Sequence, residues 1–450
     1  MRSEFFQAAG ARLFSVTASL VAGLLSLKLY SRYFTPDVYG LIVVALQLIS
    51  YLPMLDGGFR TTTNRLLLAT SEDVTRKALI EFSQTLYSWL LIVVLAVGGV
   101  GLGVYGLFAG HSEKFGPFFF AVLGIAGALS VFANAQSGLL IGLGAQTSMA
   151  VIAGVSSLAS VGALAIALSV GSGSWAFVAS LATSALTTYA LARLRLSGFG
   201  VLTPWLHFGI SAEFWIRFHE LRHDALRALR SQVSILLLFS ADLILVAIFC
   251  SPTETAIYGV LSRLHSIVRG FLQSFNEASW PIVARRAAGI EKFQTWLVHT
   301  NGWIFGLAGG GLLLLGPGFI GWYMGTAWLP SPLLNGLFVA RFLIIGSSTP
   351  ASYFLLGIGD FRSIARCCER EVAAALALGG IFGAWLGSPG IALAFLLATN
   401  AGTFLPLWII YARREHLSLA PLLLGSWMRI SSGFFIAALG WYLAVKCFIS

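Results

Sequence analysis

The chain has 450 residues, of which 57% are hydrophobic and only 10% are charged, and its formal net charge is +10. Soluble globular chains carry about 25% charged residues, so this composition excludes an ordinary soluble domain and indicates an integral membrane protein. The positive charge lies mainly in loops between apolar segments and implies no nucleic-acid partner. The four cysteines show neither metal-ligand spacing nor a disulfide framework, and we interpret them as structural.

Apolar segments long enough to cross a bilayer recur along the whole chain, since a spanning helix needs about 20 apolar residues. They are continuous, unlike the alternating strands of a membrane barrel, and so predict helices. The first runs on without a cleavage site and is expected to be an uncleaved span. In chain order the thirteen predicted spans are 11–31, 37–56, 79–109, 116–142, 147–170, 174–195, 231–250, 256–281, 295–316, 333–357, 367–387, 390–411 and 425–447.

Basic residues gather in every second loop. One side of the membrane receives the amino terminus and most arginines, including the whole stretch from Arg193 to Arg230, whereas the other side receives only Lys28, Arg32, Lys114 and Lys446. By the positive-inside rule the first side is cytoplasmic. We therefore predict a multi-pass protein of the bacterial inner membrane with its amino terminus in the cytoplasm and, because the number of spans is odd, its carboxyl terminus outside.

A similar motif occurs once in each half of the chain. Phe34-Thr35-Pro36-Asp37-Val38-Tyr39-Gly40 opens the second span, and Ser251-Pro252-Thr253-Glu254-Thr255-Ala256-Ile257-Tyr258-Gly259 opens the eighth, each with Pro in the turn and Tyr-Gly after it. Six spans per half would make the halves parallel repeats about an axis along the membrane normal, an arrangement that suits alternating access. We predict lobes at 1–196 and 231–412, joined by a cytoplasmic amphipathic linker at 197–230 and followed by an additional helix at 413–450.

The linker contains Phe214, Phe218, Leu221 and Ala225 at helical spacing, with charged residues interleaved. This pattern predicts an amphipathic helix that lies in the cytoplasmic interface of the membrane. Its position between two sets of six spans supports the division into two lobes.

Two motifs resemble a known family. The run from Tyr33 to Gly40 is similar to a Tyr-Leu-Gly-Pro-Glu-Glu-Tyr-Gly turn, although Thr35 stands where glycine is usual, and Leu55-Asp56-Gly57-Gly58-Phe59-Arg60-Thr61-Thr62-Thr63-Asn64-Arg65 follows it. Ser240-Ala241-Asp242-Leu243-Ile244-Leu245-Val246 leading to Ala256-Ile257-Tyr258-Gly259-Val260 resembles the start of the family's second half. The family is the Wzx-like polysaccharide flippases of the multidrug/oligosaccharidyl-lipid/polysaccharide (MOP) exporter superfamily.

The resemblance implies a fold and a function. The fold would be an all-α polytopic membrane protein of about 13 transmembrane helices, with two parallel six-helix repeats, a MATE/MOP-like layout and a carboxyl-terminal helix. The function would be translocation of an undecaprenyl-diphosphate-linked oligosaccharide to the periplasmic leaflet, through a V-shaped cationic cavity, for O-antigen or exopolysaccharide biosynthesis. Polysaccharide polymerase and glycosyltransferases would be partners, besides membrane lipids and the lipid-linked anionic substrate itself.

Arginines inside apolar stretches are the main candidates for a site. An arginine at mid-bilayer costs about 2.5 to 3.5 kcal/mol even on insertion scales, so it is retained mainly where it faces water, a partner or a charged ligand. Guanidinium groups bind phosphate oxygens in a bidentate manner. For Arg263 and Arg269 the competing interpretation is a structural ion pair with a carboxylate such as Asp242, and for Arg341 it is contact with neighbouring helices. For Arg12, Lys28 and Arg60, which lie at loop edges, it is topology and contact with lipid phosphates. The predicted substrate-binding residues are Arg263, Arg269, Arg12, Arg60, Lys28, Arg341 and Tyr258.

Asp242 is the candidate for ion coupling, with pairing to an arginine as the alternative interpretation. No catalytic residue, metal site or cofactor is predicted, and coupling to Na⁺ or H⁺ stays open. No lysine follows a glycine, so the sequence has no Walker A loop. The rival functions are an ion-coupled drug or metabolite exporter of the same superfamily and a membrane polymerase or glycosyltransferase. An enzyme would need acidic or histidine chemistry on sizeable external loops, and the predicted external loops are short.

Overall fold

A computed structural model of the chain describes residues 2–70, 72–109, 116–201, 206–277, 290–358, 360–414 and 418–449. Over these residues the secondary structure is helical and contains no strand. The prediction of an all-α polytopic protein is therefore confirmed.

The described residues contain 11 helical segments that are long and apolar enough to cross a membrane. Ten of them coincide with one predicted span each. The eleventh, Arg362–Arg414, contains two predicted spans, 367–387 and 390–411. Gly387 breaks the helix between these two with φ +62°, and Pro389 follows. The remaining predicted span, 256–281, corresponds to α9 (Pro252–Glu277). This helix is more polar than the eleven segments and is not counted among them.

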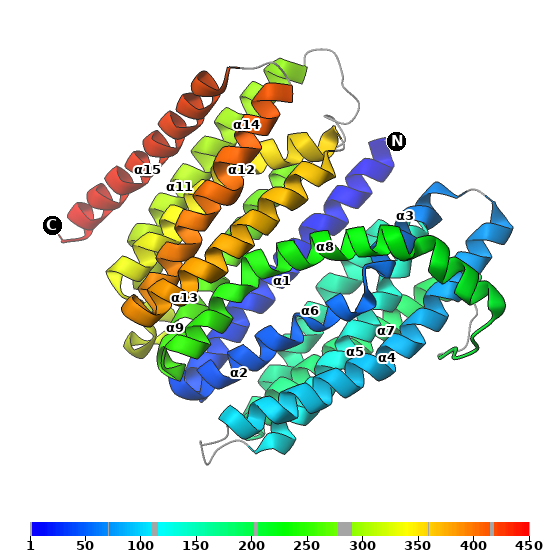
Figure 1. Cartoon of the computed structure of the whole chain (residues 1–450). Helices are drawn as coiled ribbons and strands as arrows, with labels where there is room; N and C mark the ends of the chain where they lie inside the picture. Colours follow the sequence, from blue (N-terminus) through cyan, green and yellow to red (C-terminus); the bar gives the residue numbers. More distant parts are fainter. Residues whose placement is uncertain are drawn as a thin grey trace. The chain divides into compact units, whose positions relative to one another are not determined.

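The helices divide into two compact units, which we describe separately. Unit 1 comprises Met1–Tyr33 and Val44–Val233. In it α5 packs against α4 and α7, and α1 packs against α6 (Figure 1). Its helices are α1 (Arg2–Tyr33), α3 (Phe59–Ala69), α4 (Asp73–Ala109), α5 (Pro117–Gly142), α6 (Gln146–Ser169) and α7 (Trp175–Gly198), with a short 3₁₀ turn at Leu52–Asp56.

Unit 2 comprises Phe34–Val43 and Ser234–Ser450. In it α12 packs against α9, α11, α13 and α14, and α11 also packs against α15. The aromatic core around Phe354, Trp408 and Tyr411 lies where α12 meets α14. Its helices include α11 (Ile290–Met324), α12 (Pro332–Gly357), α13 (Phe361–Thr399), α14 (Leu405–Arg414) and α15 (Leu419–Ile449).

Two helices belong partly to each unit. α2 (Pro36–Ile49) begins in unit 2 and ends in unit 1, and α8 (Ala212–Phe249) leaves unit 1 after Val233. The domain boundaries that we drew from the spans stay a prediction.

The first half of α8 corrects one expectation. It is the amphipathic helix that the sequence predicts, but its apolar face lies against protein. Phe218 stacks on Phe59 of α3 with ring centroids 4.9 Å apart, and Phe214 lies 5.1 Å from Phe82 of α4. Ala225, on the same face, is 0% exposed. This face therefore contributes to the core of unit 1 and is not available to the lipid interface.

The Asp-Gly-Gly motif before α3 makes this packing possible. Gly57 and Gly58 have φ of +63° and +81°, a region that side chains other than glycine rarely adopt. The carboxylate of Asp56 accepts a hydrogen bond from the amide of Gly58 at 2.8 Å. A Cβ atom at Gly58 would collide with the backbone of α8 at Ala225. The motif is therefore required for the close approach of two backbones.

Candidate functional site

The first Tyr-Gly pair lies against the amino-terminal end of α9, within unit 2. Gly40 lies so close to α9 that a Cβ atom there would collide with the carbonyl oxygen of Pro252. Tyr39 is buried and packs edge-on against Trp328 at 5.6 Å. The first Tyr-Gly thus anchors the start of α2 on the start of α9.

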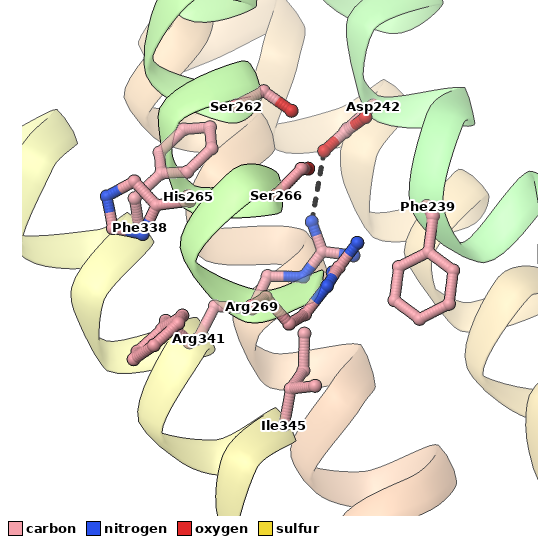
Figure 2. A pocket seen from close by; sticks show the side chains of 10 residues that line it. Phe239, Asp242, Ser262, His265, Ser266, Arg269, Phe338, Arg341 and Ile345 are labelled. Atoms are coloured by element: carbon pink, nitrogen blue, oxygen red, sulfur yellow. Dashed lines mark hydrogen bonds and ion pairs between the residues drawn. The ribbon is translucent and has the colours of Figure 1, made fainter. Parts of the chain in front are cut away.

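Tyr258, from the second pair, belongs to a buried polar network. Its hydroxyl donates to the Oδ2 atom of Asp242 at 3.2 Å. Arg341 of α12 donates to the same oxygen at 3.0 Å and to the backbone carbonyl of Leu238 at 2.8 Å. Figure 2 shows this ion pair between α8, α9 and α12. Three residues that the sequence analysis singled out therefore form one network.

This network changes the interpretation of Asp242. The carboxylate is 3% exposed and the Arg341 side chain 10% exposed, so the pair is almost fully removed from solvent. A buried carboxylate that is already paired with a guanidinium has no free charge for a metal cation. Asp242 was interpreted from the sequence either as an ion-coupling site or as the partner of an arginine. The structure shows the pairing with an arginine. The guanidinium of Arg341 also lies 4.9 Å from the ring centroid of Phe395.

Beside this pair lies a small cavity of about 30 Å³. A cavity needs about 10 to 15 Å³ to hold one water-sized group, so this one admits a group no larger than one or two waters. It is lined by Phe239, Asp242, Ser262, His265, Ser266, Arg269, Phe338, Arg341, Phe342 and Ile345. It has no room for a sugar.

The two arginines of α9 lie in different surroundings. Arg263 is exposed and, among the residues that the structure describes, makes no ion pair or side-chain hydrogen bond. Arg269 lines the cavity with its guanidinium 4.1 Å from the ring centroid of Phe239. Six residues at 1.5 Å each separate them by roughly 9 Å along the helix, on different faces. Among the described residues neither of these two arginines makes an ion pair with Asp242, whose partner is Arg341.

The candidates in unit 1 are more dispersed. Arg60 lies 3.9 Å from the carboxylate of Asp56, one turn earlier. Lys28 is exposed on α1, and Arg12 is on the same helix, with its side chain outside the described part. Arg65 pairs with Asp224 of α8 at 2.8 Å.

Comparison with solved structures identifies the fold. The lipid II flippase MurJ, in an inward closed conformation, matches with a TM-score of 0.72 and 13% identity over 97% of this chain and 92% of MurJ. An inward-facing multidrug resistance MATE family transporter of the MOP superfamily matches with a TM-score of 0.63 and 13% identity, over 90% of this chain and 99% of the transporter. This chain has the MOP fold.

A further MATE transporter, VcmN from Vibrio cholerae in the form of a point mutant, matches this MOP fold with a TM-score of 0.59 and 12% identity, over 93% of this chain and 98% of that one. No protein-family model matches the sequence, and no curated protein matches it significantly. At these identities the likeness establishes the fold alone.

The MOP fold of this chain also contains a buried carboxylate that the sequence analysis missed. Glu371 of α13 is 1% exposed. Its oxygens accept hydrogen bonds from the hydroxyls of Thr399, at 2.5 Å, and Thr403. Thr403 lies in a π-helical turn at Asn400–Phe404, and a Cβ atom at Gly402 in that turn would collide with Glu371. An acidic residue inside the predicted span 367–387 was the available signal.

His265 is buried at 6% exposure with its ring 5.4 Å from that of Phe338. Figure 2 shows its imidazole directed toward Phe338 and away from the Asp242–Arg341 pair. His265 is therefore packed against aromatic side chains of α12.

Proposed function

We propose that the protein is a flippase for an undecaprenyl-diphosphate-linked oligosaccharide, which it moves from the cytoplasmic to the periplasmic leaflet of the bacterial inner membrane. The product would serve O-antigen or exopolysaccharide biosynthesis. The MOP fold supports a transporter and not an enzyme. The observation that carries the proposal is Arg263, an exposed guanidinium without a described protein partner on the helix that contains the second Tyr-Gly pair.

The chemistry of the substrate matches this arginine. A diphosphate presents several anionic oxygens, and a guanidinium binds them with two parallel, charge-assisted hydrogen bonds while it stays charged in a low-dielectric environment. Placing a charge in a membrane span is unfavourable, so an arginine without a protein carboxylate implies an anionic ligand. Arg341 and Arg60 have carboxylates beside them already, so Arg263 is the first choice for the diphosphate.

The remaining predicted residues have supporting roles in this proposal. Arg12 and Lys28 on α1, with Arg60, would attract the anionic head group. Tyr258, Arg341 and Arg269 would keep α9 in place, with Arg263 exposed. The amino terminus would be cytoplasmic, the polymerase and glycosyltransferases would act before and after flipping, and no cofactor would be needed. Coupling to Na⁺ or H⁺ through Asp242 would require that Arg341 first release the carboxylate.

A drug or metabolite exporter is the second candidate, and the similarity to two MATE transporters supports it. An exporter of cationic drugs should present unpaired carboxylates within its spans. In the described residues Asp242 is paired with Arg341, and Glu371 is held by two threonines. Arg263 and Arg269 leave α9 with free positive charge, which favours an anionic substrate.

Deletion of the gene tests the proposal in cells. We expect complete lipid-linked repeat units to accumulate on the inner leaflet, and we expect wild type but not Arg263→Gln to relieve the accumulation. Immunoblots of membranes would show both variants at equal abundance. Single repeat units that reach the surface without polymerising would indicate a polymerase instead. An unchanged glycan profile would favour the exporter.

A further inference from the structure

Three side chains of α9 that line the small cavity make no hydrogen bond or ion pair in the described part of the chain. Ser262, Ser266 and Arg269 are spaced four and then three residues apart, which places them on one face of the helix. Among the described residues none of them makes a hydrogen bond or an ion pair. Helical serines usually donate to the carbonyl one turn earlier, as Ser83 and Ser88 do. The serines of α9 keep their donors for the cavity.

The cavity also has more positive than negative charge. Figure 2 shows the guanidinium groups of Arg269 and Arg341 converging beside Asp242. That carboxylate already accepts from Arg341 and Tyr258. Another buried carboxylate of unit 2, Glu371, has both oxygens taken by threonine hydroxyls. Two guanidinium groups therefore line the cavity with one carboxylate, which is paired with Arg341 alone. The buried Nε atom of Arg341 has no hydrogen-bond partner among the described residues.

Such an arrangement requires a counter-charge. Arg269 is half-buried and has no carboxylate within ion-pair distance among the described residues, which is unfavourable for a cation. The buried Nε donor of Arg341, without an acceptor, adds a desolvation penalty. The ring of Phe239 compensates only in part, because a cation–π contact is worth about 0.5 to 2 kcal/mol. A neutral water would accept hydrogen bonds but would leave the charge uncompensated.

We propose that this cavity binds one small inorganic anion of the halide class, with chloride as the physiological ligand. Arg269 supplies the charge, the hydroxyls of Ser262 and Ser266 donate to the ion, and Arg341 contributes its free N–H. The volume of about 30 Å³ suits a monatomic ion and excludes a diphosphate with its sugars. This site is independent of the proposed substrate contact at Arg263.

The first test is crystallographic. Crystals of the full-length protein grown with bromide in place of chloride should give an anomalous difference peak between the Arg269 and Arg341 guanidinium groups. Bromide is the probe because it scatters anomalously and shares the charge of chloride. A refined cavity with no anomalous peak at high bromide concentration would overturn the proposal, and a neutral water would then be the occupant.

The second test measures thermal unfolding in detergent with sodium chloride or sodium gluconate at equal ionic strength. Chloride should raise the unfolding midpoint of the wild type by a few degrees, because a ligand that binds only the folded state stabilises it. Arg269→Gln should lose this difference and Ser266→Ala should reduce it. Arg263→Gln is the matched control and should keep the full chloride effect even where it abolishes flipping. Equal midpoints in the two salts for the wild type would contradict the proposal.

Discussion

The arginines of unit 1 and those of α9 differ in what surrounds them. In unit 1, Arg65 pairs with Asp224 and Arg60 lies beside Asp56. On α9, Arg263 is exposed without a described partner, and Arg269 faces a cavity and an aromatic ring. Residues of one type, each near an apolar stretch, thus divide into some that lie beside a carboxylate and some without one among the described residues.

Arg341, on α12, differs from both groups, because it is buried and yet has protein partners. It is as deeply embedded as any α9 arginine, yet it has a carboxylate and a backbone carbonyl as partners. Position within a span is therefore not enough to assign an arginine to a binding site. The presence or absence of a protein acceptor decides the assignment.

The largest effect is expected from breaking the buried pair. Arg341→Ala leaves the carboxylate of Asp242 buried without its cation, which typically costs about 3 to 5 kcal/mol. The double variant Asp242→Asn with Arg341→Gln removes both charges, and its free energy of unfolding should fall markedly less. Thermal unfolding of the purified proteins measures both. If the double variant were as unstable as Arg341→Ala, the pair would not be the source of the loss.

A smaller effect is expected in unit 1 at Gly58. Gly58→Ala introduces a Cβ atom into the backbone of α8 at a positive φ, and overpacking of this kind costs about 1 to 3 kcal/mol. Gly57→Ala is the matched control, because Gly57 shares the positive φ but has only the ring of Phe59 nearby, at 3.4 Å. The unfolding midpoint should fall further for Gly58→Ala. Equal losses would mean that backbone strain alone explains the motif.

The smallest effect is expected from the surface pair of unit 1. Arg65→Gln removes a contact whose side chains are 66% and 44% exposed. Exposed pairs contribute about 0 to 1 kcal/mol, and salt screens them. The unfolding midpoint of Arg65→Gln should therefore differ little from that of the wild type at low salt and not at all at high salt. A loss as large as that of Arg341→Ala would remove the distinction between exposed and buried arginines.

Much of the fold could be predicted from the sequence, because the membrane requires long apolar helices and the spans are visible as such. Even the break between the predicted spans 367–387 and 390–411, which lies within α13, follows from a local signal, Gly387 and Pro389. The surroundings of the amphipathic half of α8 could not be predicted. Periodicity identifies an apolar face, but it does not reveal whether lipid or the aromatic rings of α3 and α4 cover it.

The members of the buried network could be singled out from the sequence, and pairing of Asp242 with an arginine was one of two interpretations, but the sequence did not identify which arginine. Asp242, Tyr258 and Arg341 were all singled out, yet the pairing of Asp242 with Arg341 joins residues 99 positions apart. A single sequence contains no information on that distance. Glu371 was not among the predicted residues, although an acidic residue in a span is as unfavourable as a basic one.

The central claim is that Arg263 binds the anionic head group during flipping. The most direct measurement is translocation of a fluorescent undecaprenyl-diphosphate oligosaccharide in proteoliposomes, followed by loss of fluorescence to a membrane-impermeant quencher. A charge-assisted hydrogen bond contributes about 1.5 to 3 kcal/mol, which corresponds to about a tenfold change in rate or more. We expect Arg263→Gln to slow flipping by at least that factor, and Arg65→Gln to match the wild type. Wild-type flipping by Arg263→Gln would contradict the account.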